Sequence, residues 1–210
     1  MNIPLAMRGA VAAGVLLFGT AACKPFKVWR VEPAGHSGPR EIVVQGPYTH
    51  TPTGAVFPEV LAGCRRGTIT AYAPGEADIG ATYQDLRGST LFATVYIYPR
   101  AQRPPLEPEP HLRGVVEEVK AHHPGAVAGE IREVAVGERR GLAVAFDYET
   151  RFGFRNTKVA SQAWLFACGD WFVKFRMTWP KDQDARAQDL LEPLVRQFGW
   201  PAVGTAGEPR

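Results

Sequence analysis

The sequence is short of the residues and motifs that usually reveal a chemical activity. It contains three cysteines, five histidines and three methionines in 210 residues. It has no P-loop, no dinucleotide-binding glycine fingerprint and no paired-cysteine zinc motif, so it shows no recognisable nucleotide or structural-zinc site. Lysine and arginine never run beyond the pairs Arg65-Arg66 and Arg139-Arg140, and the net charge is only +3. These features argue against a nucleic-acid-binding protein.

No apolar run reaches the roughly 20 residues that a membrane-spanning helix needs. A shorter run, residues 10–18, follows Arg8 and precedes the small residues 19–22. A positive residue, a short apolar stretch and small residues before a cleavage point are typical of a signal peptide. We therefore predict that residues 1–22 are a signal peptide; a start at Met1 or at Met7 would fit equally.

The end of this segment has a recognisable pattern of its own. Thr20-Ala21-Ala22-Cys23 resembles the lipobox of bacterial lipoproteins, in which the cysteine becomes the acylated (palmitate-bearing) first residue of the mature chain. Thr20 stands where a lipobox usually has leucine, and the ordinary signal peptidase would also cut before Cys23. Two forms stay open, a protein anchored by lipid to the membrane and facing the periplasm, and a soluble periplasmic protein. In a Gram-negative cell, Lys24 resembles the default for sorting to the outer membrane, because aspartate at this position is the usual retention signal.

An odd number of cysteines in an exported protein calls for an explanation. If Cys23 carries the lipid, Cys64 and Cys168 remain and can form a disulfide in an oxidising compartment. The alternative is that both are buried thiols acting as small apolar residues. The sequence leaves both alternatives open.

The remaining chain divides into three parts. Residues 23–40 contain Pro25, Pro33 and Pro39 with two glycines, a composition that predicts a tether between membrane and domain. The 45% hydrophobic content of the chain allows a single domain, which we place at residues 41–201. Residues 202–210 are expected to be a loose tail.

Strands and helices follow in a readable order within this domain. Short alternating runs divided by turn residues predict a meander of strands. A helix beginning near Pro110 has apolar residues at helical spacing, and a second helix over residues 183–198 contains Pro193, where we expect a kink. The expected strands are residues 41–45, 54–57, 66–73, 78–83, 90–98, 131–136 and 142–148, followed by a hairpin over residues 159–179. The prediction is an α+β fold, an antiparallel sheet with two main helices packed on it.

The late hairpin is the most specific structural prediction. Gly169-Asp170 supplies the positive φ of a two-residue turn. The predicted opposite pairs are Cys168 and Trp171, Phe166 and Val173, Trp164 and Phe175, and Gln162 and Met177. These residues form one apolar face, whereas the other face carries Lys174 and Arg176. We therefore expect a sheet with one buried face and these two cations in solvent, and an acidic partner for them is the alternative.

Candidate site residues are few, and each fails a test of geometry. His122 and His123 are adjacent on a helix and point about 100° apart, so both cannot face one metal ion. Asp182 and Asp184 begin like a calcium loop, but the later ligand positions are missing. Ser37 lies in a near match to a nucleophile elbow that lacks its second glycine. The sequence predicts no catalytic, cofactor-binding or metal-binding residue.

Aromatic residues at strand spacing have two interpretations, since they can fill the core or line a ligand cleft. The set comprises Tyr72, Tyr83, Tyr96, Tyr98, Tyr148, Trp164, Trp171 and Trp179.

The order of elements over residues 54–200 resembles that of PsbP-like sandwich domains, including those of bacterial lipoproteins. This resemblance implies a non-enzymatic binding or assembly module and carries over no functional residue. With the lipobox-like segment, it predicts a membrane-tethered periplasmic lipoprotein that uses no cofactor and has an envelope protein as its partner. A small hydrolase-like enzyme, with a site invisible in sequence, is the alternative.

Overall fold

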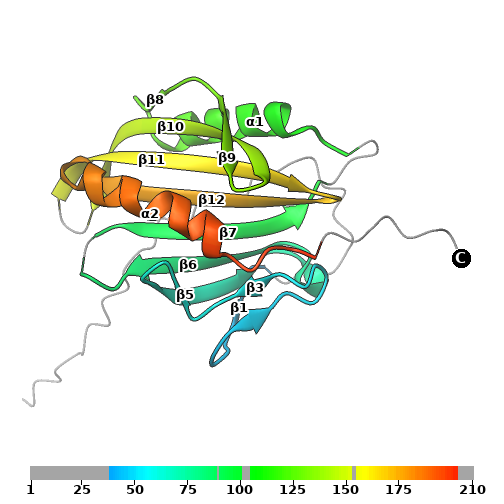
Figure 1. The fold of residues 1–210 in the computed structure, drawn as a ribbon. Coiled ribbons are helices and arrows are strands. Elements are labelled where there is room, and N and C mark those ends of the chain that lie inside the picture. Colours follow the sequence, from blue (N-terminus) through cyan, green and yellow to red (C-terminus); the bar gives the residue numbers. More distant parts are fainter. Residues whose placement is uncertain (1–37, 89, 101–104, 153–154, 203–210) are drawn as a thin grey trace, which may run out of the picture.

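The computed structural model describes residues 38–88, 90–100, 105–152 and 155–202. Within these ranges a ten-stranded antiparallel sheet has the order β1-β5-β6-β7-β12-β11-β10-β8, with β4 added to β5 and β9 added to β10. Helices α1 and α2 pack on this sheet (Figure 1). The fold class is therefore α+β, as predicted.

The helices are α1 (Pro108–His122) and α2 (Asp184–Gln197), with short 3-10 turns η1 (Pro74–Glu76) and η2 (Lys181–Gln183). The first seven strands are β1 (Arg40–Ile42), β2 (Tyr48–Thr49), β3 (Val56–Phe57), β4 (Val60–Leu61), β5 (Cys64–Ala71), β6 (Ile79–Asp85) and β7 (Phe92–Pro99). The others are β8 (Val127–Ala128), β9 (Arg132–Val136), β10 (Arg139–Phe152), β11 (Arg155–Cys168) and β12 (Trp171–Pro180). Strands β2 and β3 form a separate two-stranded sheet.

The hairpin of β11 and β12 has the predicted register. Cys168 pairs with Trp171, and the pairing continues through Trp164 and Phe175 to Gln162 and Met177. Gly169 has a φ of 58°, which a glycine adopts without the steric cost that a Cβ atom brings. Turn chemistry and alternating hydrophobicity were therefore sufficient to fix this register.

The prediction of a single buried face is wrong, because both faces of the hairpin are covered. On one face Phe166, Val173 and Phe175 belong to a core that includes the apolar side of α2. On the other face Leu165 and Phe172 belong to a second core with the apolar side of α1. Ser161, Ala163 and Leu165, which lie on the same face as Lys174 and Arg176, are all fully buried. The sheet is the middle layer of three.

The two cysteines do not form the disulfide that the sequence allowed. Both are free thiols, Cys64 buried and Cys168 half-buried. Cys64 lies on β5 and Cys168 on β11, four strand spacings away in the sheet order. At about 4.8 Å per spacing this separation is roughly 19 Å, whereas a disulfide requires Cα atoms within about 7 Å. Of the two alternatives left open by the sequence, the structure has two free thiols and no disulfide between Cys64 and Cys168.

The predicted signal peptide, Cys23, Ser37, most of the tether and most of the tail lie outside the described residues, and those assignments stay predictions. Inside the described ranges, no helix has the length and apolar character needed to cross a bilayer. Pro193 lies within α2, which continues to Gln197.

Candidate binding site

The second face of the sheet carries a group of aromatic and basic side chains where α1 does not cover it. Helix α1 packs on β10 and β11, and the neighbouring strands β7 and β12 run alongside. We call the group on these strands the α1-side surface and define it by five half-buried residues: Tyr72, Tyr96, Tyr98, Lys174 and Arg176. Pairing of β12 with β7 places Lys174 directly opposite Tyr96.

Lys174 is held against two tyrosine rings. Its Nζ lies 4.6 Å from the ring centroid of Tyr96 and 5.5 Å from that of Tyr98. An ammonium group over an aromatic face is attracted by the ring quadrupole, by about 0.5–2 kcal/mol depending on desolvation. The positive charge is therefore fixed in position on a partly buried aromatic platform. This corrects the expectation that Lys174 and Arg176 stand on a simple solvated face.

A glycine on the neighbouring strand makes room for this platform. Gly80 on β6 pairs with Tyr96, and a Cβ atom at this glycine would lie 2.8 Å from Cδ1 of the tyrosine ring. The ring of Tyr96 also lies 6.4 Å from that of Tyr72, at an interplanar angle of 34°. The tyrosine thus lies across β6, and any larger residue at position 80 would displace it.

A buried histidine connects this surface to α1. The hydroxyl of Tyr98 and Nε2 of His111 share a hydrogen bond of 2.8 Å, and the imidazole stacks on Phe172 with 4.7 Å between centroids. Burial, and then the charge of Lys174, lower the pKa of His111 to about 4. Burial, with the nearby carboxylates of Asp78 and Glu118 adding to it, raises the pKa of Tyr98 well above its usual value. Both groups are neutral at pH 7, so the pair fixes α1 without adding charge.

Arg176 extends the surface toward the end of α1. It donates to the hydroxyl of Tyr148 at 3.4 Å and to Oγ of Ser161 at 3.5 Å. The ring of Tyr148 stacks on His123, with 4.2 Å between centroids. Burial first, and then the charge of Arg176, lower the pKa of His123. His122 instead hydrogen bonds the carbonyl of Glu118, so the two adjacent histidines have different surroundings.

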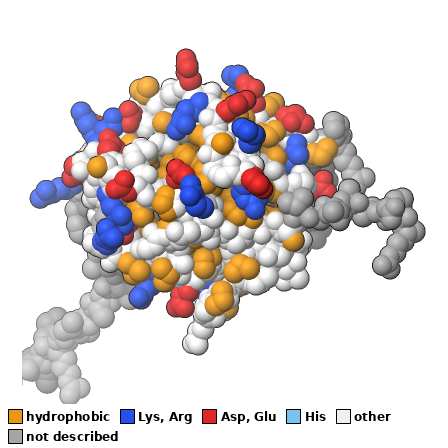
Figure 2. Space-filling view, viewed as in Figure 1, with side chains coloured by type: hydrophobic (Ala, Val, Ile, Leu, Met, Phe, Trp, Pro, Cys, Tyr) orange, Lys and Arg blue, Asp and Glu red, His pale blue; other side chains and the backbone are white. Residues whose placement is uncertain are grey.

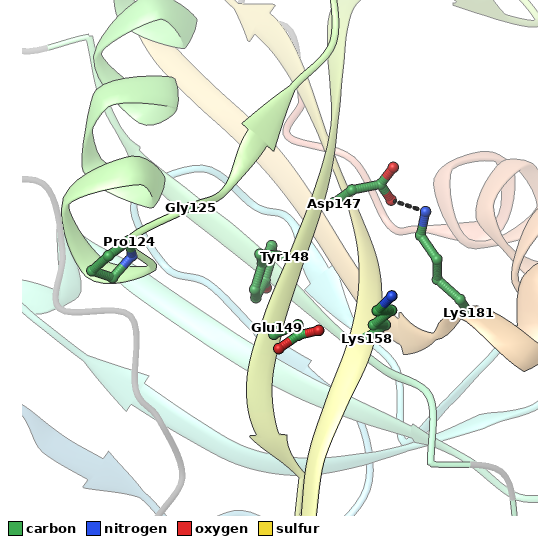
Figure 3. A pocket seen from close by; sticks show the side chains of 7 residues that line it. All are labelled: Pro124, Gly125, Asp147, Tyr148, Glu149, Lys158 and Lys181. Atoms are coloured by element: carbon green, nitrogen blue, oxygen red, sulfur yellow. Dashed lines mark ion pairs between the residues drawn. The ribbon is translucent and has the colours of Figure 1, made fainter.

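Beyond Tyr148 the surface opens into a shallow cleft of about 360 Å³. It is lined by Pro124, Gly125, Asp147, Tyr148, Glu149, Lys158 and Lys181 (Figure 3). Lys181 Nζ lies 2.8 Å from Asp147 Oδ1, and both side chains are about half exposed. An exposed ion pair of this kind contributes about 1 kcal/mol or less. Two lysines and two carboxylates leave the cleft without a preference for one sign of charge.

A second buried histidine, His50, also meets a hydroxyl group, that of Thr53. His50 Nδ1 lies 2.7 Å from Thr53 Oγ1, and its Nε2 lies 2.7 Å from the carbonyl oxygen of Glu76. The histidine is 0% exposed, and Thr53 also accepts the amide hydrogen of Ala55. This arrangement closes a turn and leaves no space for a substrate. Ser161 is also buried, and its hydroxyl shares a hydrogen bond with the hydroxyl of Thr178.

The aromatic residues divide between the two interpretations. Tyr83, Trp164 and Trp179 are buried in the α2-side core, and each ring donates a hydrogen bond, to Pro58, Gln162 and Asp184 respectively. The tyrosines of the α1-side surface are Tyr96 and Tyr98, at alternate positions of β7, and Tyr72. Position within the strand, not aromatic character, decides which interpretation applies, since successive side chains point to opposite faces.

Within the described residues no group of three His, Cys, Asp or Glu side chains is arranged to hold a metal ion. The arrangement on the α1 side is suited to contact instead. Its rings and fixed cations can cover an apolar surface and donate hydrogen bonds to acceptors.

No protein-family model matches this chain, and no curated protein matches it. The solved structures that this chain resembles include the following two. The solution structure of cyanobacterial PsbP from Synechocystis sp. PCC 6803 has a TM-score of 0.40 at 11% identity, over 81% of this chain and 97% of its own. The crystal structure of LpqN, involved in cell envelope biogenesis of Mycobacterium tuberculosis, has a TM-score of 0.42 at 12% identity, over 79% and 93% respectively.

Proposed function

We propose that this chain is an exported, non-enzymatic binding module, held at the periplasmic side of a membrane by a lipid on Cys23. On this proposal it binds an envelope protein through the α1-side surface. The lipobox-like segment supports the membrane attachment, and the geometry of the described residues supports binding. Among the described residues, the two His–hydroxyl hydrogen bonds reported above, His50 with Thr53 and His111 with Tyr98, both involve buried imidazoles.

The observation that carries the binding proposal is the stack of Lys174 on Tyr96 and Tyr98. Tyrosine and arginine are enriched among the residues that dominate binding energy at protein interfaces. Rings and cations that are already fixed lose little side-chain entropy on binding. Lys174 and Arg176 favour a partner that brings carboxylate or carbonyl oxygens to this surface.

The membrane attachment is tested by the intact mass of the protein extracted from membranes of the producing cell. A mass larger by acyl chains than the chain beginning at Cys23 would support the lipid anchor. An unmodified mass beginning at Cys23 would refute it and leave a soluble periplasmic protein.

The binding surface is tested separately by site-specific photo-crosslinking in intact cells. A photoreactive residue replaces Thr82, which is exposed on β6 and pairs with Thr94 of β7, and a control places it at Gln188 on α2. We expect a discrete adduct from position 82 that Lys174→Glu removes and that Arg132→Glu, at an exposed cation of β9, preserves. Equal adducts from both positions, or an adduct insensitive to Lys174→Glu, would contradict the assignment of this surface.

A further inference from the structure

The opposite face of the sheet contains a second, larger cleft of about 560 Å³. Its lining residues belong to the turn between β9 and β10, the end of β11 and the C-terminal end of α2, which are elements labelled in Figure 1. Figure 2 views this face, where hydrophobic side chains are visible among scattered acidic and basic ones. The lining residues are Val136, Gly137, Glu138, Arg139, Arg140, Phe166, Ala167, Cys168, Val195, Arg196 and Trp200. We call it the α2-side cleft; its volume is within the range of small-molecule sites, about 300–1,000 Å³.

An aromatic wall of the α2-side cleft is fixed in place. Trp200 Nε1 donates to the carbonyl oxygen of Val195 at 2.9 Å, and its ring meets that of Phe166 edge to face at 5.0 Å. Phe166 lies close against β10 because residue 141 is glycine: a Cβ atom there would lie 2.6 Å from Cδ1 of the phenylalanine. The wall is therefore rigid and apolar before any ligand arrives.

Arg139 lies on this wall with its guanidinium group stacked on the ring of Trp200. Its guanidinium carbon is 4.1 Å from the ring centroid of Trp200. Stacking occupies the flat face of a guanidinium and leaves its N–H donors directed outward in the plane. The side chain is half-buried, yet across the described part of the chain no carboxylate or carbonyl accepts from it. A stacked arginine with a free edge is suited to bind a carboxylate with two parallel hydrogen bonds.

None of the other charged residues that line the α2-side cleft is as well placed as Arg139 to bind a carboxylate. The side chain of Arg196 hydrogen bonds Glu192. Arg140 follows Arg139 on β10, and alternation directs it to the other face of the sheet. Glu138 is exposed in the turn, and it is the one carboxylate among the residues that line the cleft. Arg139 is therefore the lining cation that is placed to bind an anion, and this preference rests on its stacked geometry and not on the net charge of the lining.

We propose that the α2-side cleft binds a small organic acid, with its carboxylate on the edge of Arg139 and its apolar body against the half-buried ring of Trp200. Cys168 lines the same cleft, so its thiol reports whether the cleft is occupied. Burial raises the pKa of this thiol, and alkylation at mildly alkaline pH is therefore slow enough to follow.

The test measures the rate of Cys168 alkylation in the full chain, with cysteine peptides separated by mass. Hexanoate is the probe, acetate supplies the carboxylate alone and hexanol supplies the apolar body alone. We expect hexanoate to slow alkylation of Cys168 in a saturable manner, at concentrations where acetate and hexanol have little effect. Cys64, buried elsewhere, should stay unmodified throughout and so report that the domain is folded.

Matched variants decide whether Arg139 is the anion-binding group. Arg139→Leu should raise the hexanoate concentration for half-protection at least about tenfold, the loss expected for a charge-assisted hydrogen bond. Arg132→Leu, at an exposed arginine of β9, should leave it unchanged. If Arg139→Leu exposes Cys64, Arg139→Lys is used, which keeps the charge and loses the planar fork. Equal protection by hexanol, equal effects of the two leucine variants, or no protection by hexanoate would overturn the proposal.

Discussion

Acidification should destabilise this domain through the buried imidazole of His111. Its folded-state pKa is lowered from 6.5 to about 4, chiefly by burial and further by Lys174. Above pH 6.5 the imidazole is neutral in the folded and the unfolded chain, and no stability is lost. Between pH 6.5 and pH 4 the unfolded chain binds a proton that the folded chain does not. The free energy of unfolding therefore falls as the pH falls through this window.

The size of the loss follows from the two pKa values. Each pH unit in the window costs up to about 1.4 kcal/mol, which gives about 3 kcal/mol between pH 6.5 and pH 4. That is a large part of the 5–15 kcal/mol typical of a folded domain. His50 and His123, whose pKa values burial also lowers, act in the same direction. So does Glu76, whose carboxylate accepts a hydrogen bond from Tyr48 that lowers its pKa.

A variant comparison separates His111 from these other groups. Urea unfolding is measured from pH 7 to pH 4 for the unaltered chain, His111→Gln and His122→Gln. Glutamine at position 111 should lower stability at pH 7, yet the deficit should shrink by about 3 kcal/mol at pH 4, because the variant has no imidazole there to protonate. His122 is exposed on the same helix, so its variant should follow the unaltered chain. A constant deficit for His111→Gln at every pH would refute the reasoning.

Three further results are expected. Arg186→Ala should lower the free energy of unfolding by about 3–5 kcal/mol in urea, because Arg186 donates twice to Asp85, whose side chain is 0% exposed. The exposed-pair control Arg196→Ala should cost under about 1 kcal/mol, and similar losses for both would contradict this. Gly169→Val should cost about 1–3 kcal/mol, since valine must adopt the φ of 58°, and unchanged stability would count against the turn. Reductant should leave the thermal midpoint unchanged, since both cysteines of the domain are free, and a drop would reveal a bridge.

The sequence was informative where the determining interactions are local. Gly169-Asp170 and the alternation on either side of it were enough to give the register from Cys168 to Gln162. The helix at Leu112 and the strand alternation at Val95 were readable for the same reason, since each pattern is complete within one segment. Both helices and the longer strands could therefore be predicted from periodicity, whereas the two-residue strands β2, β4 and β8 were not predicted.

The second buried face was missed because the helix that covers it comes from elsewhere in the chain. Leu165 lies opposite Lys174, and Ala163 lies opposite Arg176, a mixture that resembles an outer face. Long cationic side chains can bury their stems against rings while keeping their charge near solvent. A face can therefore contain lysine and arginine and still be the floor beneath a helix. Only the position of α1 in the folded chain shows whether such a face is exposed to solvent or covered by a helix.

The α1-side surface could not be found from sequence because its parts meet through one long-range pairing. Tyr96 and Lys174 are 78 residues apart, and the pairing of β7 with β12 alone sets them opposite each other. This pairing is also the link between the strands before α1 and those after it. A shift of one residue would move Lys174 into the α2-side core and carry Phe175 out of it. Burial of Phe175 therefore fixes the register, and the position of the surface cation is a consequence of how the opposite face packs.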